Sequence, residues 1–297
     1  MPADDAAGNG GGTVTIDPTW TVTPDGHEVA AEAKGLTKIY WTATGEVHAL
    51  QAVDAWFPAK AVTAVVGPSG SGKSSLLRIL AGLDRPTAGQ VRVGESELST
   101  LPPARLRKYR RRVVSYVFQR PSDNLISYLN VEQHMLLAGR LRGGQREHAA
   151  EGKQLLEMLQ IDHRLHHKPH QLSGGEQQRL AFAQAIVGAP ALVVADEPTA
   201  ELDSRTGQLL LATVHELSSL GIGFVIATHD AGVVKEADRT IFLRHGAMEA
   251  ERHLDERSLS VIDGAGRIQL PPHALRLFPE RRAVIGVDEG EIRITPP

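Results

Sequence analysis

The segment GPSGSGKS at residues 67–74 contains residue types suited to binding phosphate groups. Its three glycines let the backbone curl so that successive N–H groups point at phosphate oxygens. Lys73 supplies a cation for the β- and γ-phosphates, and the Ser74 hydroxyl is a suitable Mg²⁺ ligand. The segment therefore predicts a nucleoside triphosphate site. Its candidate contacts are Gly67, Pro68, Ser69, Gly70, Ser71, Gly72, Lys73, Ser74 and Ser75.

A second segment, LSGGEQQR at residues 172–179, also has the composition of an anion site. Ser173, Gly174 and Gly175 lead into a polar, helix-forming run. Free backbone N–H groups at a helix N-terminus, together with the positive end of the helix dipole, favour an anion. The chain thus has two phosphate-binding segments, about a hundred residues apart.

Two adjacent carboxylates follow the apolar run ALVVAD at residues 191–196. Asp196 ends a strand on the edge of the sheet where the phosphate loop lies, and can hold Mg²⁺ directly or through water. Glu197 points elsewhere and is placed to polarise a water for in-line attack on the γ-phosphate. The alternative is an acidic turn capped by Pro198. With a phosphate loop in the same chain, the catalytic interpretation is favoured.

The elements that must position these residues are indicated by hydrophobic patterns. The short apolar runs at 61–67, 191–196 and 223–228 are typical of parallel strands buried on both faces. A helical pattern follows the phosphate loop. Between 101 and 171, charged helical stretches replace the apolar runs. We therefore expect an α/β fold, in which a mostly parallel sheet carries a helical subdomain.

Both ends of the chain differ from the central unit at 31–253. Residues 1–30 form an extension with a disordered Gly-rich start and a short strand within 13–22. Residues 254–297 alternate apolar runs with Gly turns and predict a β-rich appendage containing one short helix. About 40 residues rarely hold a core alone, so this piece should pack on the body or pair with another copy. We expect it to be dimerising or regulatory.

In this order, the motifs resemble the ATP-binding cassette (ABC) ATPase family over residues 32–250, and LSGGEQQR is similar to the family's signature sequence. The resemblance implies that Gln119, in YVFQRP, contacts Mg²⁺ and the attacking water and links the helical subdomain to the core. It implies that His229, in ATHD, contacts the γ-phosphate and that Asp203, in AELD, lies at a subunit interface. Tyr40, in LTKIY, matches the aromatic that stacks on adenine. Alone, each could be purely structural, but their ordered set favours the family.

The resemblance also implies a head-to-tail dimer with two composite sites. In this family the signature of one cassette covers the γ-phosphate held by the other's phosphate loop. Such enclosure suits phosphoryl transfer, because a γ-phosphate with one face in water lacks the dipoles that stabilise developing charge. The implied cofactors are ATP and Mg²⁺. Ser173, Gly174 and Gly175 would serve the partner's ATP, Ser74, Gln119 and Asp196 would hold Mg²⁺, and Glu197, His229 and Gln119 would be catalytic.

Residues 35–57 and 81–93 are similar to the branch of lipoprotein-release, macrolide-export and cell-division ABC ATPases. That branch works with a separate membrane permease, whose docking site is implied near residues 121–133. No stretch approaches the roughly 18 apolar residues of a membrane span. The N-terminus lacks a secretion signal, and there is no cysteine. We therefore expect a peripheral protein at the cytoplasmic face of the membrane, whose cargo is selected by the permease.

Two alternative functions share some of these sequence features. A soluble ABC ATPase of translation or DNA repair would usually carry tandem cassettes or a coiled-coil insert, and the sequence has neither. The tail weakly resembles the swapped hairpins of AbrB-type regulators, which bind DNA. However, the sequence from Asp255 onward contains seven acidic residues and six arginines, and the whole chain has a net charge of −3. This balance lacks the basic footprint of a DNA-binding protein, so no nucleic acid partner is expected.

Four histidines cluster in the segment DHRLHHKPHQ at residues 162–171. Histidine clusters can bind metal ions. Here the favoured interpretation is an exposed connector to the signature helix, because only Asp162 adds a further ligand.

Overall fold

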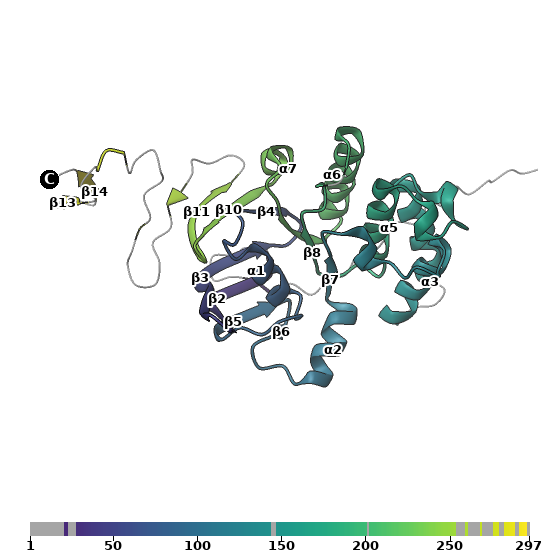
Figure 1. Ribbon diagram of the computed structural model, residues 1–297, viewed down its shortest axis with the longest axis horizontal. Helices are drawn as coiled ribbons and strands as arrows, with labels where there is room; N and C mark the ends of the chain where they lie inside the picture. The colour runs from purple at the N-terminus through teal and green to yellow at the C-terminus, as the bar shows by residue number, and fades with distance from the viewer. Residues whose placement is uncertain are drawn as a thin grey trace, which may run out of the picture.

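The protein is described by a computed structural model, which is mixed α/β and contains two large β-sheets and a third, two-stranded sheet near the C-terminus (Figure 1). The parallel sheet and helical group expected from the sequence are both present. The described residues are 21–22, 28–143, 147–200, 202–253, 259–260, 268, 276–278, 282–288 and 291–295.

The larger sheet has seven strands in the order β12-β11-β10-β4-β9-β8-β7. The five strands from β10 to β7 are parallel, whereas β11 and β12 are antiparallel. Both faces of the parallel part are covered, since neighbouring residues of β9, such as Val225 and Ile226, belong to two different core clusters. The bounds are β4 (Val62–Val66), β7 (Val114–Val117), β8 (Leu192–Asp196), β9 (Gly223–Ala227), β10 (Arg239–Arg244), β11 (Ala247–His253) and β12 (Leu259–Ser260).

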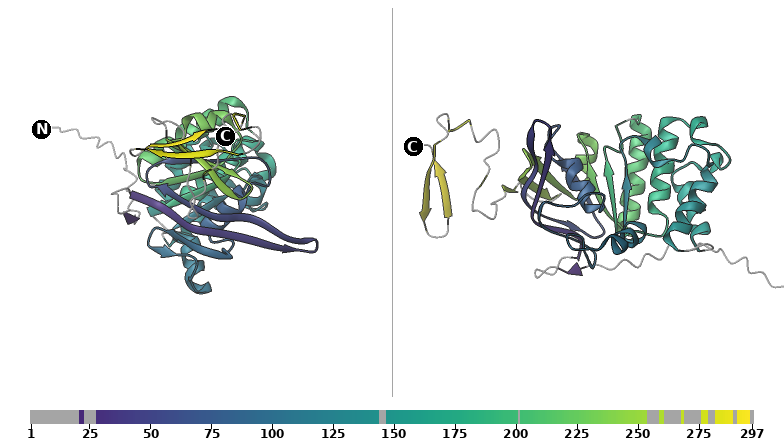
Figure 2. Two further views of the ribbon diagram at one scale, coloured as in Figure 1. Left: turned by 90° about the vertical axis from the view of Figure 1, so that its left-hand side faces the viewer. Right: turned by 60° about the horizontal axis from the view of Figure 1, so that its bottom comes forward.

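The smaller sheet is antiparallel and lies across helix α1 (Lys73–Leu80) from the larger one. The buried leucines and isoleucine of α1 share one core cluster with residues of both sheets. Strands β2 and β3 form a long hairpin that extends beyond the body of the molecule (Figure 2). The strands of this smaller sheet are β1 (Thr21–Val22), β2 (Glu28–Thr42), β3 (Gly45–Pro58), β5 (Ala88–Val93) and β6 (Ser96–Glu97). β1 covers the end of the strand predicted within 13–22, and residues 13–20 lie outside the described part.

Helices α3, α4 and α5 pack together at the end of the molecule beyond β7 (Figure 1). β7 lies within the stretch 101–171 that was expected to be mainly helical, and α5 continues the helical group past that stretch. Among the described helices, none combines the length and apolar character that a membrane span needs. The helices are α2 (Pro103–Arg112), η1 (Pro121–Asn124), α3 (Val131–Arg142), α4 (Glu147–Met158), η2 (Asp162–Arg164), η3 (Pro169–Gln171), α5 (Gly174–Ile186), α6 (Ser204–Ser219) and α7 (Ala231–Glu236).

Near the C-terminus, β13 (Val284–Asp288) and β14 (Glu291–Thr295) form a separate two-stranded antiparallel sheet. These strands correspond to the last two that the sequence predicts. The short helix and most of the other tail strands fall on residues outside the described part of the chain.

Candidate functional site

The phosphate loop, residues 67–72, connects β4 to α1 at the carboxyl edge of the parallel strands. Two of its glycines are required by close backbone approach. A Cβ on Gly67 would lie 2.1 Å from the carbonyl oxygen of Leu243, and one on Gly72, whose φ is 103°, would lie 2.2 Å from that of Ala49. No side chain caps the start of α1. Its first N–H groups are therefore free to bind an anion.

Lys73 is folded back over this loop. Its Nζ donates to the carbonyl oxygens of Gly67 at 2.8 Å and Pro68 at 3.2 Å. Ser74 is exposed on the first turn of α1, whereas Ser71 is buried and its hydroxyl has no hydrogen-bond partner within the described structure. An unpaired hydroxyl inside a tightly packed loop fits a ligand that brings its own acceptors, as a phosphate does.

The candidate Mg²⁺ ligands lie on neighbouring elements at the same sheet edge. Asp196 is the last residue of β8, and Gln119 is exposed just beyond the end of the adjacent strand β7. Tyr116 donates to Asp196 Oδ2 at 3.4 Å, and burial together with that carboxylate raises the pKa of the Tyr116 hydroxyl. Ser74, Asp196 and Gln119 each offer a side-chain oxygen, the kind of donor that a hard cation such as Mg²⁺ prefers.

Glu197 and His229 are brought together as a pair. Glu197 has a φ of 47°, a left-handed conformation uncommon outside glycine, and its N–H donates to the Ala227 carbonyl at 2.8 Å. The turn places Glu197 Oε2 2.8 Å from His229 Nδ1. The hydrogen bond and the charge of Glu197 raise the pKa of His229. Strained backbone of this kind concentrates at functional sites.

Two further residues, not among those predicted from the sequence, join the loops that carry this pair. Thr199 donates from Oγ1 to Asp230 Oδ2 at 3.0 Å, joining the loop after β8 to the loop after β9. The other oxygen of Asp230 accepts from the Gly232 N–H at 2.8 Å and caps α7. Both residues adjoin predicted motifs, but no spacing rule pairs them across 31 positions.

The signature segment begins α5 with a capping box. Ser173 accepts a hydrogen bond from the Glu176 N–H at 3.2 Å, and its own N–H donates to Glu176 Oε2 at 2.8 Å. Burial alone would raise the pKa of Glu176, but the Ser173 N–H and Arg164, 2.8 Å away, lower it to about 2. The carboxylate therefore stays ionised and fixes the Ser173 side chain at the helix start.

Ser173 and its glycines lie beside the segment around Asp203, away from the phosphate loop. A Cβ on Gly175 would lie 3.3 Å from Thr206 Cγ2, and Asp203 caps α6 by accepting from the Arg205 and Thr206 N–H groups. Within the described structure, no hydrogen bond or ion pair joins residues 172–176 to residues 67–75. The two candidate anion-binding segments therefore begin different helices, α1 and α5, without a polar contact between them in the described part of the chain.

Tyr40 lies on β2 next to α1. Its hydroxyl donates to Asp84 Oδ2 at 2.8 Å and is 3.4 Å from Ser75 Oγ. Its neighbour Trp41 points away into solvent and is 78% exposed. The candidate base-stacking residue thus adjoins the phosphate-binding helix.

A cavity of about 370 Å³ lies between β7, η1, α2, α3 and α5. Its wall is largely apolar, with Leu83, Phe118, Ile126 and Leu141 among the lining residues, and Arg110 and Arg111 of α2 also line it. Six of the ten residues of α2 are Arg or Lys, and all six are exposed. None of them forms an ion pair with a carboxylate of the described residues.

The histidine cluster does not form a metal site in the part of the chain that the structure describes. His163 contacts Glu176 at 3.7 Å, but no group of three or more potential ligands is arranged to hold an ion there.

Comparison with known proteins gives matches over most of the chain. The family model described as "ABC transporter" matches residues 50–200. The lipoprotein-releasing system ATP-binding protein LolD of Chromohalobacter salexigens is 37% identical over 227 residues, 76% of this chain and 95% of that protein. The macrolide export ATP-binding/permease protein MacB of Pectobacterium atrosepticum is 37% identical over 220 residues, 73% of this chain but only 33% of MacB.

A solved structure supports the same fold. The dimeric post-hydrolysis state of the ATP-binding cassette MJ0796, bound to ADP and Pi, superposes with a TM-score of 0.71 at 33% identity. The match covers 76% of this chain and 100% of that one.

Proposed function

The chain belongs to the ABC transporter ATPase family, as its motifs predicted, and we propose that two copies clamp two ATP molecules head to tail and drive a separate membrane permease. The observation that carries this proposal is the separation of the two half-sites within one chain. Lys73 begins α1 whereas Ser173 caps the start of α5, and among the described residues no hydrogen bond or ion pair joins the two segments. The dimeric structure of the MJ0796 cassette bound to ADP and Pi supports the proposal that two copies pair.

In the proposed reaction, Lys73 and the loop N–H groups hold the β- and γ-phosphates. Mg²⁺, held by Ser74, Asp196 and Gln119, would neutralise charge on the phosphate oxygens. Glu197 accepts a hydrogen bond from the attacking water and orients it.

Further groups surround the γ-phosphate in this proposal. His229 reaches it from the pair that it forms with Glu197. Ser173, Gly174 and Gly175 of the partner close the open side with their N–H groups, and Asp203 lies at the same interface. Enclosure by fixed dipoles stabilises the charge that develops during transfer.

This proposal predicts that ATP hydrolysis depends on protein concentration. Specific activity should rise with concentration over the range in which the dimer forms and then level off, because a monomer holds only open half-sites. A dilution series followed by phosphate release, with an inert protein added to prevent adsorption, measures this. Constant specific activity down to concentrations at which the ATP-bound chain is monomeric would contradict the proposal.

We also propose that the permease docks at the cavity beside α2, close to residues 121–133, and so holds the chain at the cytoplasmic face of the membrane. The apolar wall suits the apolar face of a partner segment. The six exposed cations of α2, which form no ion pair with a carboxylate of the described residues, favour a segment that also carries carboxylates. LolD and MacB bear names that refer to lipoprotein release and macrolide export, which supports a transport role but does not identify the cargo.

Reversing two cation charges at the cavity should weaken permease docking. The double variant Arg110→Glu, Arg111→Glu should lose roughly tenfold or more in affinity for the permease, because like charges then face the partner's carboxylates. Its basal ATP hydrolysis should be unchanged. Co-sedimentation with permease-containing membranes measures the affinity. The matched control, Arg105→Glu, Arg107→Glu, makes the same charge change on α2 away from the cavity lining; equal binding by both double variants would contradict the docking site.

We propose a role for the C-terminal appendage in dimer stabilisation or regulation. Its β13–β14 hairpin exposes Val284 and Ile285, which are 54% and 64% exposed. No nucleic acid partner is proposed, since the tail has more acidic residues than arginines. The division of the chain at residues 253 and 254 is part of this proposal.

A further inference from the structure

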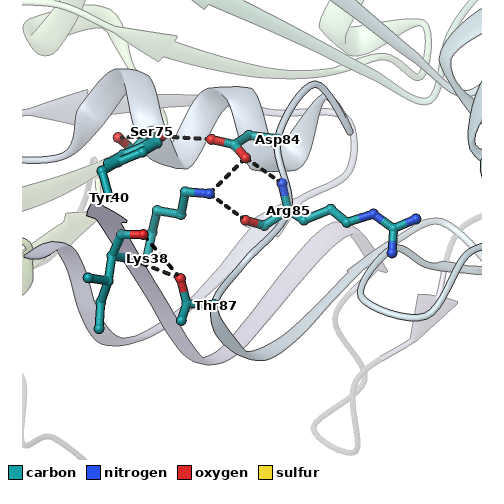
Figure 3. A network of polar contacts seen from close by, with 7 residues as sticks. Lys38, Tyr40, Ser75, Asp84, Arg85 and Thr87 are labelled. Atoms are coloured by element: carbon teal, nitrogen blue, oxygen red, sulfur yellow. Dashed lines mark hydrogen bonds and ion pairs between the residues drawn. The ribbon is translucent and has the colours of Figure 1, made fainter. Parts of the chain in front are cut away.

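The Tyr40 side chain is held on two sides by charged groups (Figure 3). Lys38, two residues earlier on the same face of β2, places its ammonium 4.6 Å from the centre of the Tyr40 ring. The Tyr40 hydroxyl donates to Asp84 Oδ2 at 2.8 Å. One ring face is thus covered by a cation, and the hydroxyl end of the ring is held by a hydrogen bond to a carboxylate.

Asp84 is the centre of this arrangement. Its second oxygen, Oδ1, accepts from Lys38 Nζ at 2.8 Å and from the Arg85 N–H at 2.7 Å. Lys38 also donates to the Arg85 carbonyl at 2.9 Å. The side chains of Lys38 and Asp84 are only 12% and 22% exposed, so this ion pair is well shielded from water.

The arrangement is anchored to the phosphate-binding helix. The Asp84 N–H bonds to the carbonyl of Arg78, a residue of α1, at 3.2 Å. The Tyr40 hydroxyl also approaches Ser75 on the first turn of α1, at 3.4 Å. The tyrosine is thereby positioned relative to the same helix whose N-terminus forms part of the phosphate cradle.

The charge states of Asp84 and Tyr40 suit the hydrogen bond between them. Burial tends to raise the pKa of Asp84, but the hydrogen bonds from Lys38 and Tyr40 lower it, so the carboxylate remains an acceptor. Burial and the nearby Asp84 raise the pKa of Tyr40, so the phenol keeps the proton that it donates.

We infer that Asp84 is a positioning residue for nucleotide binding: with Lys38, it fixes the Tyr40 ring so that the uncovered face stacks on the base of ATP. This rests on the proposed function, in which Tyr40 contacts adenine. Asp84 itself touches neither base nor phosphate. Its effect should therefore be confined to nucleotides that carry a base, and it should require Tyr40.

The test compares Asp84→Asn in two backgrounds with two ligands. Base–aromatic stacking contributes about 5- to 150-fold in affinity, so Tyr40→Ala should raise the Kd for ATP by about that factor. Asp84→Asn should raise it at least about threefold, a part of the same contribution. In the Tyr40→Ala background, Asp84→Asn should have no further effect. Inorganic tripolyphosphate, which has no base, should bind every variant with the same Kd.

Two further variants separate positioning from general damage to the fold. Lys38→Met removes the ion pair but leaves Asp84, and should weaken ATP binding in the same direction, again only when Tyr40 is present. Asp54→Asn is the matched control: its carboxylate accepts a backbone N–H on the same hairpin, from Gly35 at 2.7 Å, without a hydrogen bond to Tyr40. Its Kd for ATP should match that of the unmodified chain.

Results that contradict the role of Asp84 can be told apart from results that contradict the base contact of Tyr40. If Asp84→Asn still weakens ATP binding when Tyr40 is alanine, or weakens tripolyphosphate binding equally, then Asp84 does not act through the ring and the inference is wrong. The inference also fails if Tyr40→Ala weakens ATP binding while Asp84→Asn does not. Unchanged binding by Tyr40→Ala would instead overturn the proposed base contact, and the inference with it.

Discussion

Glu197→Gln is expected to stop ATP turnover while ATP binding persists, so that the variant accumulates as an ATP-bound dimer. Loss of a general base lowers rates by about 10²- to 10⁴-fold. Glutamine keeps the size of the side chain and an oxygen that can still accept from His229, which is 2.8 Å from Glu197 in the structure. The fold and the phosphate cradle should therefore remain intact.

Phosphate release and size-exclusion chromatography with and without ATP measure the two halves of this expectation. The control is Glu157→Gln, an exposed glutamate of α4 whose i,i+4 contact with Lys153 is 3.7 Å long. It should hydrolyse ATP normally and should not accumulate as a dimer. Undiminished turnover by the Glu197 variant would remove this residue as the base.

Lys73→Ala is expected to raise the dissociation constant for ATP by about 10- to 150-fold. A charge-assisted hydrogen bond contributes about 1.5–3 kcal/mol, and the ammonium of Lys73 lies against the loop that would bind the phosphates, 2.8 Å from the Gly67 carbonyl oxygen. Isothermal titration with ATP, in the Glu197→Gln background to prevent turnover, gives the constant directly.

Lys73 also bonds to two carbonyl oxygens of its own loop, so its loss could loosen the cradle. Lys73→Met keeps most of the apolar stem and serves as a second variant, and thermal unfolding without nucleotide shows whether the fold is intact. Lys60→Ala, which removes an exposed lysine paired with Glu28 at 2.7 Å, is the surface control. Equal ATP affinity in the Lys73 and Lys60 variants would refute the phosphate-cradle assignment.

The parts of the fold that the sequence predicted well are those with a local physical signal. Strands β4, β8 and β9 appear as continuous apolar runs because both of their faces are buried. The start of α5 is indicated by Ser173 and Glu176, which form a capping box within four residues. Strand β7 gave no comparable signal, since it has only four residues and follows the charged helix α2.

The contacts that the sequence could not supply join distant positions. Tyr40 and Asp84 are 44 residues apart, and no periodicity relates them. The left-handed conformation of Glu197 depends on its bond to Ala227 in the neighbouring strand. The placement of the two candidate anion sites on different helices, α1 and α5, on which the dimer proposal depends, likewise follows from topology and not from sequence spacing.

The measurement that tests the central claim most directly is a structure of the Glu197→Gln variant with ATP. The proposal predicts a two-fold dimer in which Ser173 Oγ of one protomer lies within hydrogen-bond distance, about 2.7–3.2 Å, of the γ-phosphate held by Lys73 of the other. A structure with ATP bound at Lys73 and Ser173 remote from every triphosphate would contradict it.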